Sequence, residues 1–402
     1  MPRVLCLVAH YLPGYKAGGA LRSVANLVEA MGHAWEFLVV TSDRDLGDAV
    51  PYAGVRRDTW LAQGPAKVWY ASGGWRDVAR LVRDTHADVL YLNSFFDARF
   101  SIAALRAARR HPVESRRIVL APRGEFSPGA LRLKAFKKRL YLAWAKRSAL
   151  YRGLTWHAST PLEADEIRRA FGDVAADVRV APDLVLPTPA LDEGAHGPPK
   201  SRRPLRIAFV SRLSPKKNLP FALEALRPVT VPVEFDIYGP AEDQAHVALC
   251  RTLAARLPAN VQVRFHGAIE HGEVGRVLGA SHLFFLPTLG ENFGHVIAEA
   301  LGAGTPVLVS DRTPWRSLAE RGAGWDLPLD DPAAFSRSIE ALAAVDDERY
   351  RAMRAAARRH AGTVAPAVTN DQLMRLFFGP ADAPHPPPGR SAREVPREAA
   401  KS

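Results

Sequence analysis

Short apolar runs alternate with longer amphipathic stretches along the first half of the chain. The short runs have the length of buried strands, and the stretches between them repeat apolar residues at helical spacing. The expected strands are Val4–Ala9, Glu36–Thr41, Val89–Asn93 and Ile118–Ala121, and the expected helices are Ala20–Met31, Trp75–Thr85, Ser101–Arg110 and Leu131–Leu150. This alternation is typical of βαβ units that build a parallel sheet.

The same pattern restarts after a segment rich in Pro and Gly. The expected strands there are Leu205–Val210, Val233–Tyr238, Val261–His266, Leu283–Leu286 and Pro306–Val309. We therefore predict an α/β protein with two doubly wound, Rossmann-like domains that face each other across a cleft. The predicted parts are a first domain (1–186), a linker (187–204), a second domain (205–365), a helix packing back on the first domain (366–378) and a disordered tail (379–402).

Length and charge narrow the class of protein. A chain of 402 residues with 47% hydrophobic residues is a globular protein of about two domains. Its net charge of +12 favours anionic partners. Cys6 and Cys250 lie in apolar segments of different halves, which predicts free buried thiols and a reducing compartment. No apolar run is long enough for a membrane span or a secretory signal, so we expect a cytoplasmic protein.

Two glutamates separated by seven residues stand at a strand-to-helix junction. Glu291 precedes, and Glu299 follows, the predicted start of a helix near Gly294. His295 and Glu299 are four residues apart and would share one helix face. Strand, glycine turn and helix N-terminus make an anion site, and the two acids could bind hydroxyl groups. Alternatively, Glu291 is an N-terminal glutamate favoured by the helix dipole, and Glu299 is an exposed glutamate in the middle of the helix.

Two loops that follow predicted strands carry groups suited to a phosphate-containing ligand: a basic pair in one and a glycine pair in the other. Arg212 directly follows a predicted strand, and Lys217 stands near the start of the next helix, so both could bind a diphosphate. A solvated basic loop is the alternative. Gly18 and Gly19 join the first strand to the first helix and would let a ligand approach the backbone. The loop does not match the dinucleotide-binding glycine pattern.

Further polar residues follow other strands of the first half. Arg123 and Glu125 come after Ile118–Ala121, and Asn93 ends Val89–Asn93. Arg123 could act electrostatically and Glu125 could accept from a hydroxyl, or the two could form a surface ion pair. His157 could face the cleft, although a buried histidine with satisfied nitrogens is slightly favoured. The acids in Asp43–Asp45 suggest a metal only weakly, since no third ligand clusters with them.

Taken together, these residues resemble the retaining glycosyltransferases of family 4, which have the GT-B fold. The family's Glu-x7-Glu motif matches Glu291 and Glu299, and its Arg-x4-Lys clamp matches Arg212 and Lys217. The resemblance extends to about residue 378. The sequence segments around Glu291 and around Arg123 are similar to those of a branch of the family that builds surface polysaccharides.

The resemblance implies roles for individual residues. Arg212, Lys217 and Glu291 would be catalytic, with Glu291 on the donor sugar and Glu299 on the ribose. The donor site would also include Gly18, Gly19, Tyr238, Gly239, Gly267, Ile269, Asn292, Phe293, Gly294 and His295. Asn93, Arg123 and Glu125 would lie on the acceptor side. The co-substrate would be a nucleotide-diphosphate sugar, and no metal or other cofactor would be needed. Many relatives have Gly at Asn292 and His at Arg123.

One segment, residues 131–152, is both basic and amphipathic. It fits a helix lying on an anionic membrane, which a lipid-linked acceptor would explain, or a core-packed helix with a solvated basic face. The implied function is sugar transfer to a glycan or lipid-linked acceptor in surface polysaccharide biosynthesis. Rival interpretations are a nucleotide-sugar epimerase, a phosphorylase, or a non-enzymatic anion-binding or nucleic-acid-binding protein. No nucleic-acid-binding motif is present, so we expect no such partner.

Overall fold

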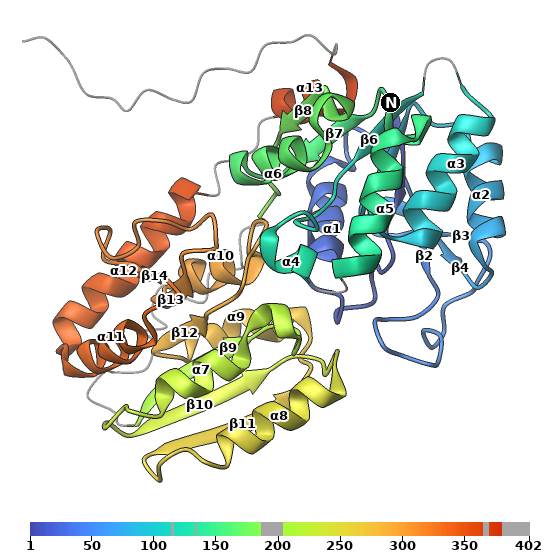
Figure 1. Ribbon diagram of the computed structural model, residues 1–402. Helices are drawn as coiled ribbons and strands as arrows, with labels where there is room; N and C mark the ends of the chain where they lie inside the picture. The colour runs from blue at the N-terminus through green and yellow to red at the C-terminus, as the bar shows by residue number, and fades with distance from the viewer. Residues whose placement is uncertain (114–115, 133–134, 186–203, 365–369, 380–402) are drawn as a thin grey trace, which may run out of the picture.

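The protein contains two sheets, each flanked by helices, and Figure 1 shows them as separate bodies. The computed structural model describes residues 1–113, 116–132, 135–185, 204–364 and 370–379. Most of the expected linker and all but the first residue of the expected tail lie outside these ranges. The expected α/β class with two Rossmann-like domains is confirmed.

The N-terminal domain is built on an eight-stranded sheet, counted over the described residues, with the order β3-β4-β2-β1-β5-β6-β7-β8. Only the edge strand β3 is antiparallel to its neighbour. The strands are β1 Arg3–Leu7, β2 Glu36–Ser42, β3 Trp60–Gln63, β4 Ala66–Ala71, β5 Val89–Leu92, β6 Arg117–Leu120, β7 Thr155–Ala158 and β8 Asp177–Val180. The helices are α1 Gly19–Met31, α2 Trp75–Asp84, α3 Ala103–Arg110, α4 Pro128–Arg132, α5 Ala135–Arg147 and α6 Pro161–Phe171, with short π or 3-10 turns at Ala98–Ile102, Ala149–Tyr151 and Gly172–Ala175.

The C-terminal domain is built on a parallel sheet, six-stranded within the described ranges, with the order β11-β10-β9-β12-β13-β14. The strands are β9 Leu205–Val210, β10 Val233–Tyr238, β11 Val261–Gly267, β12 Leu283–Leu286, β13 Val307–Ser310 and β14 Gly324–Leu327. The helices are α7 Leu219–Leu226, α8 Gln244–Ala254, α9 His271–Gly279, α10 His295–Gly302, α11 Pro332–Ala344 and α12 Asp347–Val364, with a 3-10 turn at Pro215–Lys217.

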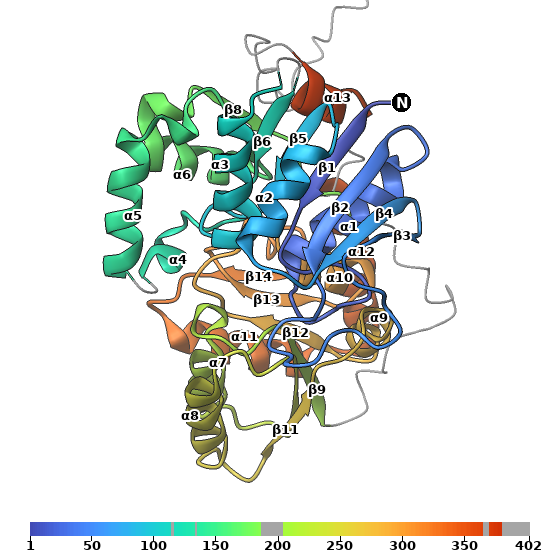
Figure 2. The same cartoon turned by 90° about the vertical axis from the view of Figure 1, so that its right-hand side faces the viewer.

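The last described helix, α13 (Asn370–Phe378), lies against the N-terminal domain in both ribbon views (Figures 1 and 2). Leu373, Leu376 and Phe377 are buried in the same cluster as the residues of β1 and α1. The ring of Phe377 meets Tyr91 edge-on at 4.9 Å between centroids. The chain therefore returns to its first domain after completing the second.

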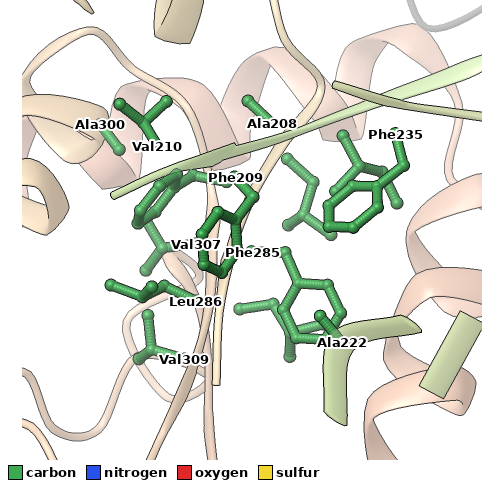
Figure 3. Packing of buried hydrophobic residues seen from close by; sticks show 14 of the residues in the cluster. Ala208, Phe209, Val210, Ala222, Phe235, Phe285, Leu286, Ala300, Val307 and Val309 are labelled. Atoms are coloured by element: carbon green, nitrogen blue, oxygen red, sulfur yellow. The ribbon is translucent and has the colours of Figure 1, made fainter. Parts of the chain in front are cut away.

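Apolar strands are buried because helices cover both faces of each sheet. In the second domain, Phe209, Phe235 and Phe285 from three neighbouring strands pack together without solvent exposure (Figure 3). Burying one such side chain contributes about 1.5–3 kcal/mol. Both cysteines are free and buried, as the sequence predicts.

The carboxyl ends of the two sheets meet. A Cβ atom on Gly124, in the loop after β6, would lie 2.9 Å from Cβ of Asn292, in the loop after β12. One on Gly129 of α4 would lie 2.7 Å from the carbonyl oxygen of Leu289. Loops that follow parallel strands carry the ligands of such folds. The junction between the domains is therefore where the candidate residues must be sought.

Candidate functional site

The first feature of the junction is the loop and helix that carry the two glutamates. Strand β12 ends at Leu286, and α10 begins at His295 with Gly294 as its N-cap, as the sequence predicts. Gly294 has φ +83°, and a Cβ there would lie 2.9 Å from Cδ1 of Ile297, so only glycine fits this turn. Trp315 Nε1 donates to the carbonyl of Phe293 at 2.7 Å, which holds the loop from behind.

Glu291 and Lys217 form a close ion pair. Lys217 Nζ donates to Glu291 Oε1 at 2.6 Å, and their side chains are only 12% and 10% exposed. Burial by itself would raise the pKa of Glu291, but the charges of Lys217 and Lys216 outweigh it and lower the pKa. Glu291 is therefore an ionised acceptor of hydrogen bonds, and neither residue belongs to a solvated loop.

Unpaired backbone donors follow Glu291. Its own amide donates to the carbonyl of Arg312 at 3.0 Å. The amides of Asn292, Phe293 and Gly294 have no acceptor within the described part of the chain. Next to them, the side-chain Oδ1 of Asn292 is buried without a hydrogen-bond partner. A row of free donors beside an ionised carboxylate is a site for a ligand that carries both oxygen acceptors and hydroxyls.

Arg212 follows β9 and reaches across the junction. Its Nη1 donates to Glu242 Oε2 at 3.0 Å, and both side chains are about one-third exposed. Its Nε lies 3.5 Å from the position that a Cβ on Gly18 would occupy. Gly18, at φ +74°, therefore brings the first loop of the N-terminal domain onto a cation of the C-terminal one.

Glu299 lies one helical turn beyond His295 on α10. Its side chain is 16% exposed, so it is not an ordinary solvated glutamate. Burial raises its pKa to about 7, although His295 and Arg22 oppose this shift. His271 of α9 approaches it with Nδ1 at 3.9 Å from Oε1. The Glu299 carboxyl is thus enclosed, and its raised pKa places its titration near neutral pH.

The strand ends of β10 and β11 form a second wall. Tyr238 and His266 stack with ring centroids 4.4 Å apart and 10° between planes. Gly239 is required by packing, since a Cβ there would lie 1.8 Å from the carbonyl of Ser211, and its amide donates to Gly267 at 2.7 Å. Gly267 is exposed and Ile269 is half-buried.

The acceptor-side candidates lie inside the N-terminal domain. Arg123, with a left-handed φ of +56°, donates to Asp183 at 2.5 Å and to the Tyr91 hydroxyl at 2.6 Å. Two of its nitrogens also donate to Asn93 Oδ1, at 3.1 and 2.7 Å. Glu125 accepts from Ser94 Oγ at 2.8 Å and from the backbone amides of Phe95 and Phe96. Burial raises the pKa of Glu125.

The surface ion pair considered for Arg123 and Glu125 is therefore wrong, because each binds other, buried partners. It remains a prediction that an acceptor substrate contacts Asn93, Arg123 and Glu125. The favoured interpretation of His157 is confirmed. Its ring nitrogens meet the Tyr91 hydroxyl at 2.7 Å and the Ala181 carbonyl at 2.8 Å, and burial lowers its pKa to about 4.

The acids after β2 have other partners too. Asp43 pairs with Arg44 at 2.8 Å and with Arg57 at 3.6 Å. Asp45 accepts from the amides of Tyr15 and Lys16 at 2.8 and 3.1 Å, which fixes the first loop. The described residues contain no cluster of three or more metal-ligating side chains.

Four residues of the junction were not found from the sequence. Lys216 lies near Glu291, and burial lowers its pKa. Ser23 and Arg22 come from α1, and Asp183 follows β8. The signal for the α1 pair was present, since both stand one turn after Gly18 and Gly19. Asp183 could not be placed because β8 was not recognised as a strand.

Comparison with known proteins identifies the class. Two doubly wound domains meeting at the carboxyl ends of their strands define the GT-B fold. The family description "Glycosyl transferase 4-like domain" matches residues 18–183, and "Glycosyl transferases group 1" matches residues 196–360. The chain belongs to the group 1, family 4-like glycosyltransferases. The family resemblance seen in the sequence is thus confirmed.

Curated relatives match part of the chain. The phosphatidyl-myo-inositol mannosyltransferase of Mycobacterium leprae is 30% identical over 180 residues, which is 42% of this chain and 46% of the relative. The D-inositol 3-phosphate glycosyltransferase of Corynebacterium efficiens is 30% identical over 213 residues, 48% of each chain. The alignments span about half the length of these relatives.

Solved structures match nearly the whole chain. HepE of Anabaena, in complex with UDP and glucose, superposes with a TM-score of 0.68 at 18% identity and covers 93% of this chain and 99% of its own. WaaG, described as a glycosyltransferase involved in lipopolysaccharide biosynthesis, gives 0.62 at 14% identity, with 94% and 100% covered. At such identities the likeness concerns the fold.

Proposed function

We propose that this protein transfers a sugar from a nucleotide-diphosphate sugar to a hydroxyl of a glycan or lipid-linked acceptor. The observation that carries the proposal is the buried Lys217–Glu291 pair beside three free backbone amides. Arg212 and Glu299 belong to the same domain as this pair, Arg212 in the loop after β9 and Glu299 on α10. Cations, hydroxyl acceptors and amide donors are the groups that a diphosphate joined to two sugars requires.

The chemistry follows from the charges. Cleavage of the donor leaves negative charge on the diphosphate, and the preorganised cations Lys217 and Arg212 stabilise it without solvent reorganisation. Glu291 and the amides after it hold the donor sugar, and Glu299 holds the ribose. The acceptor hydroxyl attacks from the face that the phosphate leaves and gives its proton to the leaving phosphate oxygen, which results in retention. In this proposal Lys217 and Arg212 take the place of a metal ion. Tyr238, Gly239, Gly267 and Ile269 flank the nucleotide.

The acceptor and the setting are part of the proposal. By their names, the two curated relatives act on inositol that carries a phosphatidyl or phosphate group. WaaG is involved in lipopolysaccharide biosynthesis. A membrane-linked precursor of a surface polysaccharide is the acceptor class that suits these neighbours. The protein would work in the cytoplasm, at the inner face of the plasma membrane.

A panel of nucleotide sugars tests the donor site. We expect one member to raise the melting temperature, because a ligand at a hundred times its Kd stabilises the folded state by about 2.7 kcal/mol. The measurement is thermal unfolding with UDP-, GDP-, ADP- and dTDP-sugars, followed by a transfer assay with the stabilising donor. Absence of any shift across the panel would count against the donor site.

The membrane contact rests on α5. Phe136, Leu140 and Trp144 are 81%, 65% and 43% exposed, and their four-residue spacing places them along one side of the helix. Exposed cations flank them at Lys137, Arg139, Lys146 and Arg147. In Figure 2, α5 runs along the outer edge of the N-terminal domain. Lys134, which the sequence also suggested, lies outside the described residues. No described helix has the length and apolar character needed to cross a bilayer.

Vesicle binding tests this contact. We expect the protein to co-sediment with vesicles rich in phosphatidylglycerol and not with pure phosphatidylcholine, since apolar insertion and basic charge act together. Changing Phe136, Leu140 and Trp144 to serine should release the protein from the anionic vesicles. The control is Leu249→Ser on α8, which removes a 50% exposed leucine elsewhere. Equal sedimentation of the triple variant and the control would reject the contact.

A further inference from the structure

The first turns of α1 lie directly on the start of α10. Ser23 Oγ is 3.0 Å from His295 Nε2, and it donates to the carbonyl of Gly19 at 3.0 Å. A Cβ on Gly19 would lie 3.9 Å from His295 Cδ2. Asp183 of the same domain also approaches His295, at 3.7 Å. Helix α1 is therefore an N-terminal wall of the site that α10 carries.

Arg22 belongs to this contact and has no fixed partner. It precedes Ser23 and is half-buried. Among the described residues its guanidinium forms no hydrogen bond or ion pair. Burial lowers its pKa, while the negative charge of Glu299 acts in the opposite direction. The charge of Arg22 also helps burial to lower the pKa of His271, to about 4. Arg22 thus faces the wall formed by Glu299 and His271.

An enclosed guanidinium without a partner carries an uncompensated desolvation cost. An anion that binds beside it relieves that cost, and Arg binds phosphate through paired N–H donors. Arg212 lies against Gly18, four residues earlier in the chain, which is about one helical turn or ~6 Å along α1. Arg22 is therefore near the proposed diphosphate clamp, and its charge acts on the proposed ribose acceptor Glu299.

We propose that Arg22 is a donor-binding residue supplied by the N-terminal domain, and that its guanidinium binds the phosphate next to the ribose. This inference rests on the function proposed above. Arg212 and Lys217 then bind the diphosphate from one domain while Arg22 binds it from the other. Bound donor consequently links α1 to α10, and it adds to the contact that Ser23 and His295 already make.

Arg22→Gln tests the assignment through the phosphate. The probes are UDP and GDP, each compared with its nucleoside, with Kd measured by calorimetry or by competition. We expect the tighter nucleoside diphosphate to bind roughly ten- to a hundredfold more weakly, since a hydrogen bond to a charged group is lost. At a pH well above 7, where Glu299 is ionised with or without Arg22, the nucleoside should keep its affinity. Arg83→Gln is the control, because within the described ranges that exposed arginine pairs only with the neighbouring Asp84 of α2.

A pH profile gives a second readout, which reports whether the charge of Arg22 acts on Glu299. Ionised Glu299 accepts hydrogen bonds more strongly from ribose hydroxyls than the protonated acid does, so nucleoside affinity should rise as pH increases through about 7. His271, His295 and Arg22 are the charged or titratable groups recorded around it. Removing the Arg22 cation should move the midpoint to higher pH. The Arg83→Gln control should leave the midpoint in place.

The outcomes separate this inference from the proposed function. Unchanged diphosphate affinity in Arg22→Gln, with wild-type binding intact, overturns the role of Arg22 and leaves the donor site standing. Equal losses for nucleoside and diphosphate also overturn it, because they place Arg22 away from the phosphate. Failure of the wild-type protein to bind any nucleotide removes the donor site itself.

Discussion

Replacing Lys217 with alanine should reduce sugar transfer by ~10²–10³-fold, the loss typical of removing one preorganised charge donor from a transition state. Lys217 Nζ lies 2.6 Å from Glu291 Oε1, and its side chain is 12% exposed. The diphosphate of the donor is already charged, and additional negative charge develops on it as the glycosidic bond breaks. The loss should therefore appear in kcat more than in the KM for the donor. Initial rates with the stabilising nucleotide sugar measure both constants.

Glu291, the ion-pair partner of Lys217, is better tested by substitution with glutamine than with alanine. Alanine at Lys217 leaves Glu291 enclosed, with Lys216 as its remaining nearby cation, so part of any effect could come from a displaced carboxylate. Glu291→Gln keeps the shape and an acceptor oxygen while removing the charge. We expect it to lose transfer as well, because the amide no longer attracts Lys217. A double variant that is no slower than Lys217→Ala would show that the two act as one unit. Full activity in either single variant would contradict the site.

The sequence alone was sufficient to predict the part of the site that lies in the C-terminal domain. Gly294, followed by an apolar helix, predicted the start of α10, and the structure confirms it. Long apolar runs predicted β1, β2 and β9, because strands buried on both faces are nearly continuously apolar. Arg212, Lys217 and Glu291 could be located because each stands at the end of such a strand or in the turn after it.

Short strands at the edge of the first sheet were not predicted. β7 and β8 have four residues each, with polar or charged residues at alternate positions, whereas the equally short β5 and β12 are wholly apolar. The pairing of β7 and β8 depends on distant contacts. Asp177 of β8, for instance, accepts from Thr155 of β7 at 2.7 Å. Without β8, nothing in the sequence could bring Asp183 next to Arg123. Arg123 was therefore interpreted as an acceptor-side residue or as half of a surface ion pair with Glu125, although its partner Asp183 stands sixty residues away.

The helix expected at Leu131–Leu150 shows another limit. The described helices in this stretch are α4 and α5, and residues 133–134 between them lie outside the described part. Composition predicted the basic and apolar character of this stretch. It could not show which apolar residues the core would leave exposed. Ala145 is the buried residue of α5, whereas Phe136 and Trp144 face outward. Exposure of a large side chain is decided by the tertiary packing.

Arg123→Met should lower the free energy of unfolding by ~3–5 kcal/mol, the cost of breaking a buried ion pair by removing one partner. Arg123 and Asp183 are 8% and 5% exposed and 2.5 Å apart. The variant leaves the Asp183 carboxylate enclosed and takes a donor from Tyr91 and Asn93. Arg168→Met is the matched control. Its pair with Asp165 is 3.2 Å long, but the side chains are 47% and 65% exposed, so the expected change is about 0–1 kcal/mol.

The pH dependence of this loss identifies its cause. Burial alone would raise the pKa of Asp183, but Arg123, with help from His295 and His157, lowers it below the ordinary range. A lowered pKa means stability that is present above the unfolded value of about 3.9 and is lost as pH falls through the folded one. Without Arg123, burial dominates, the pKa rises, and the carboxyl prefers to be protonated in the folded state. The gap between wild type and Arg123→Met should therefore be widest at neutral pH and shrink toward about pH 4. Chemical denaturation across that range measures it, and a gap independent of pH would show that lost packing, rather than the unpaired charge of Asp183, destabilises the variant.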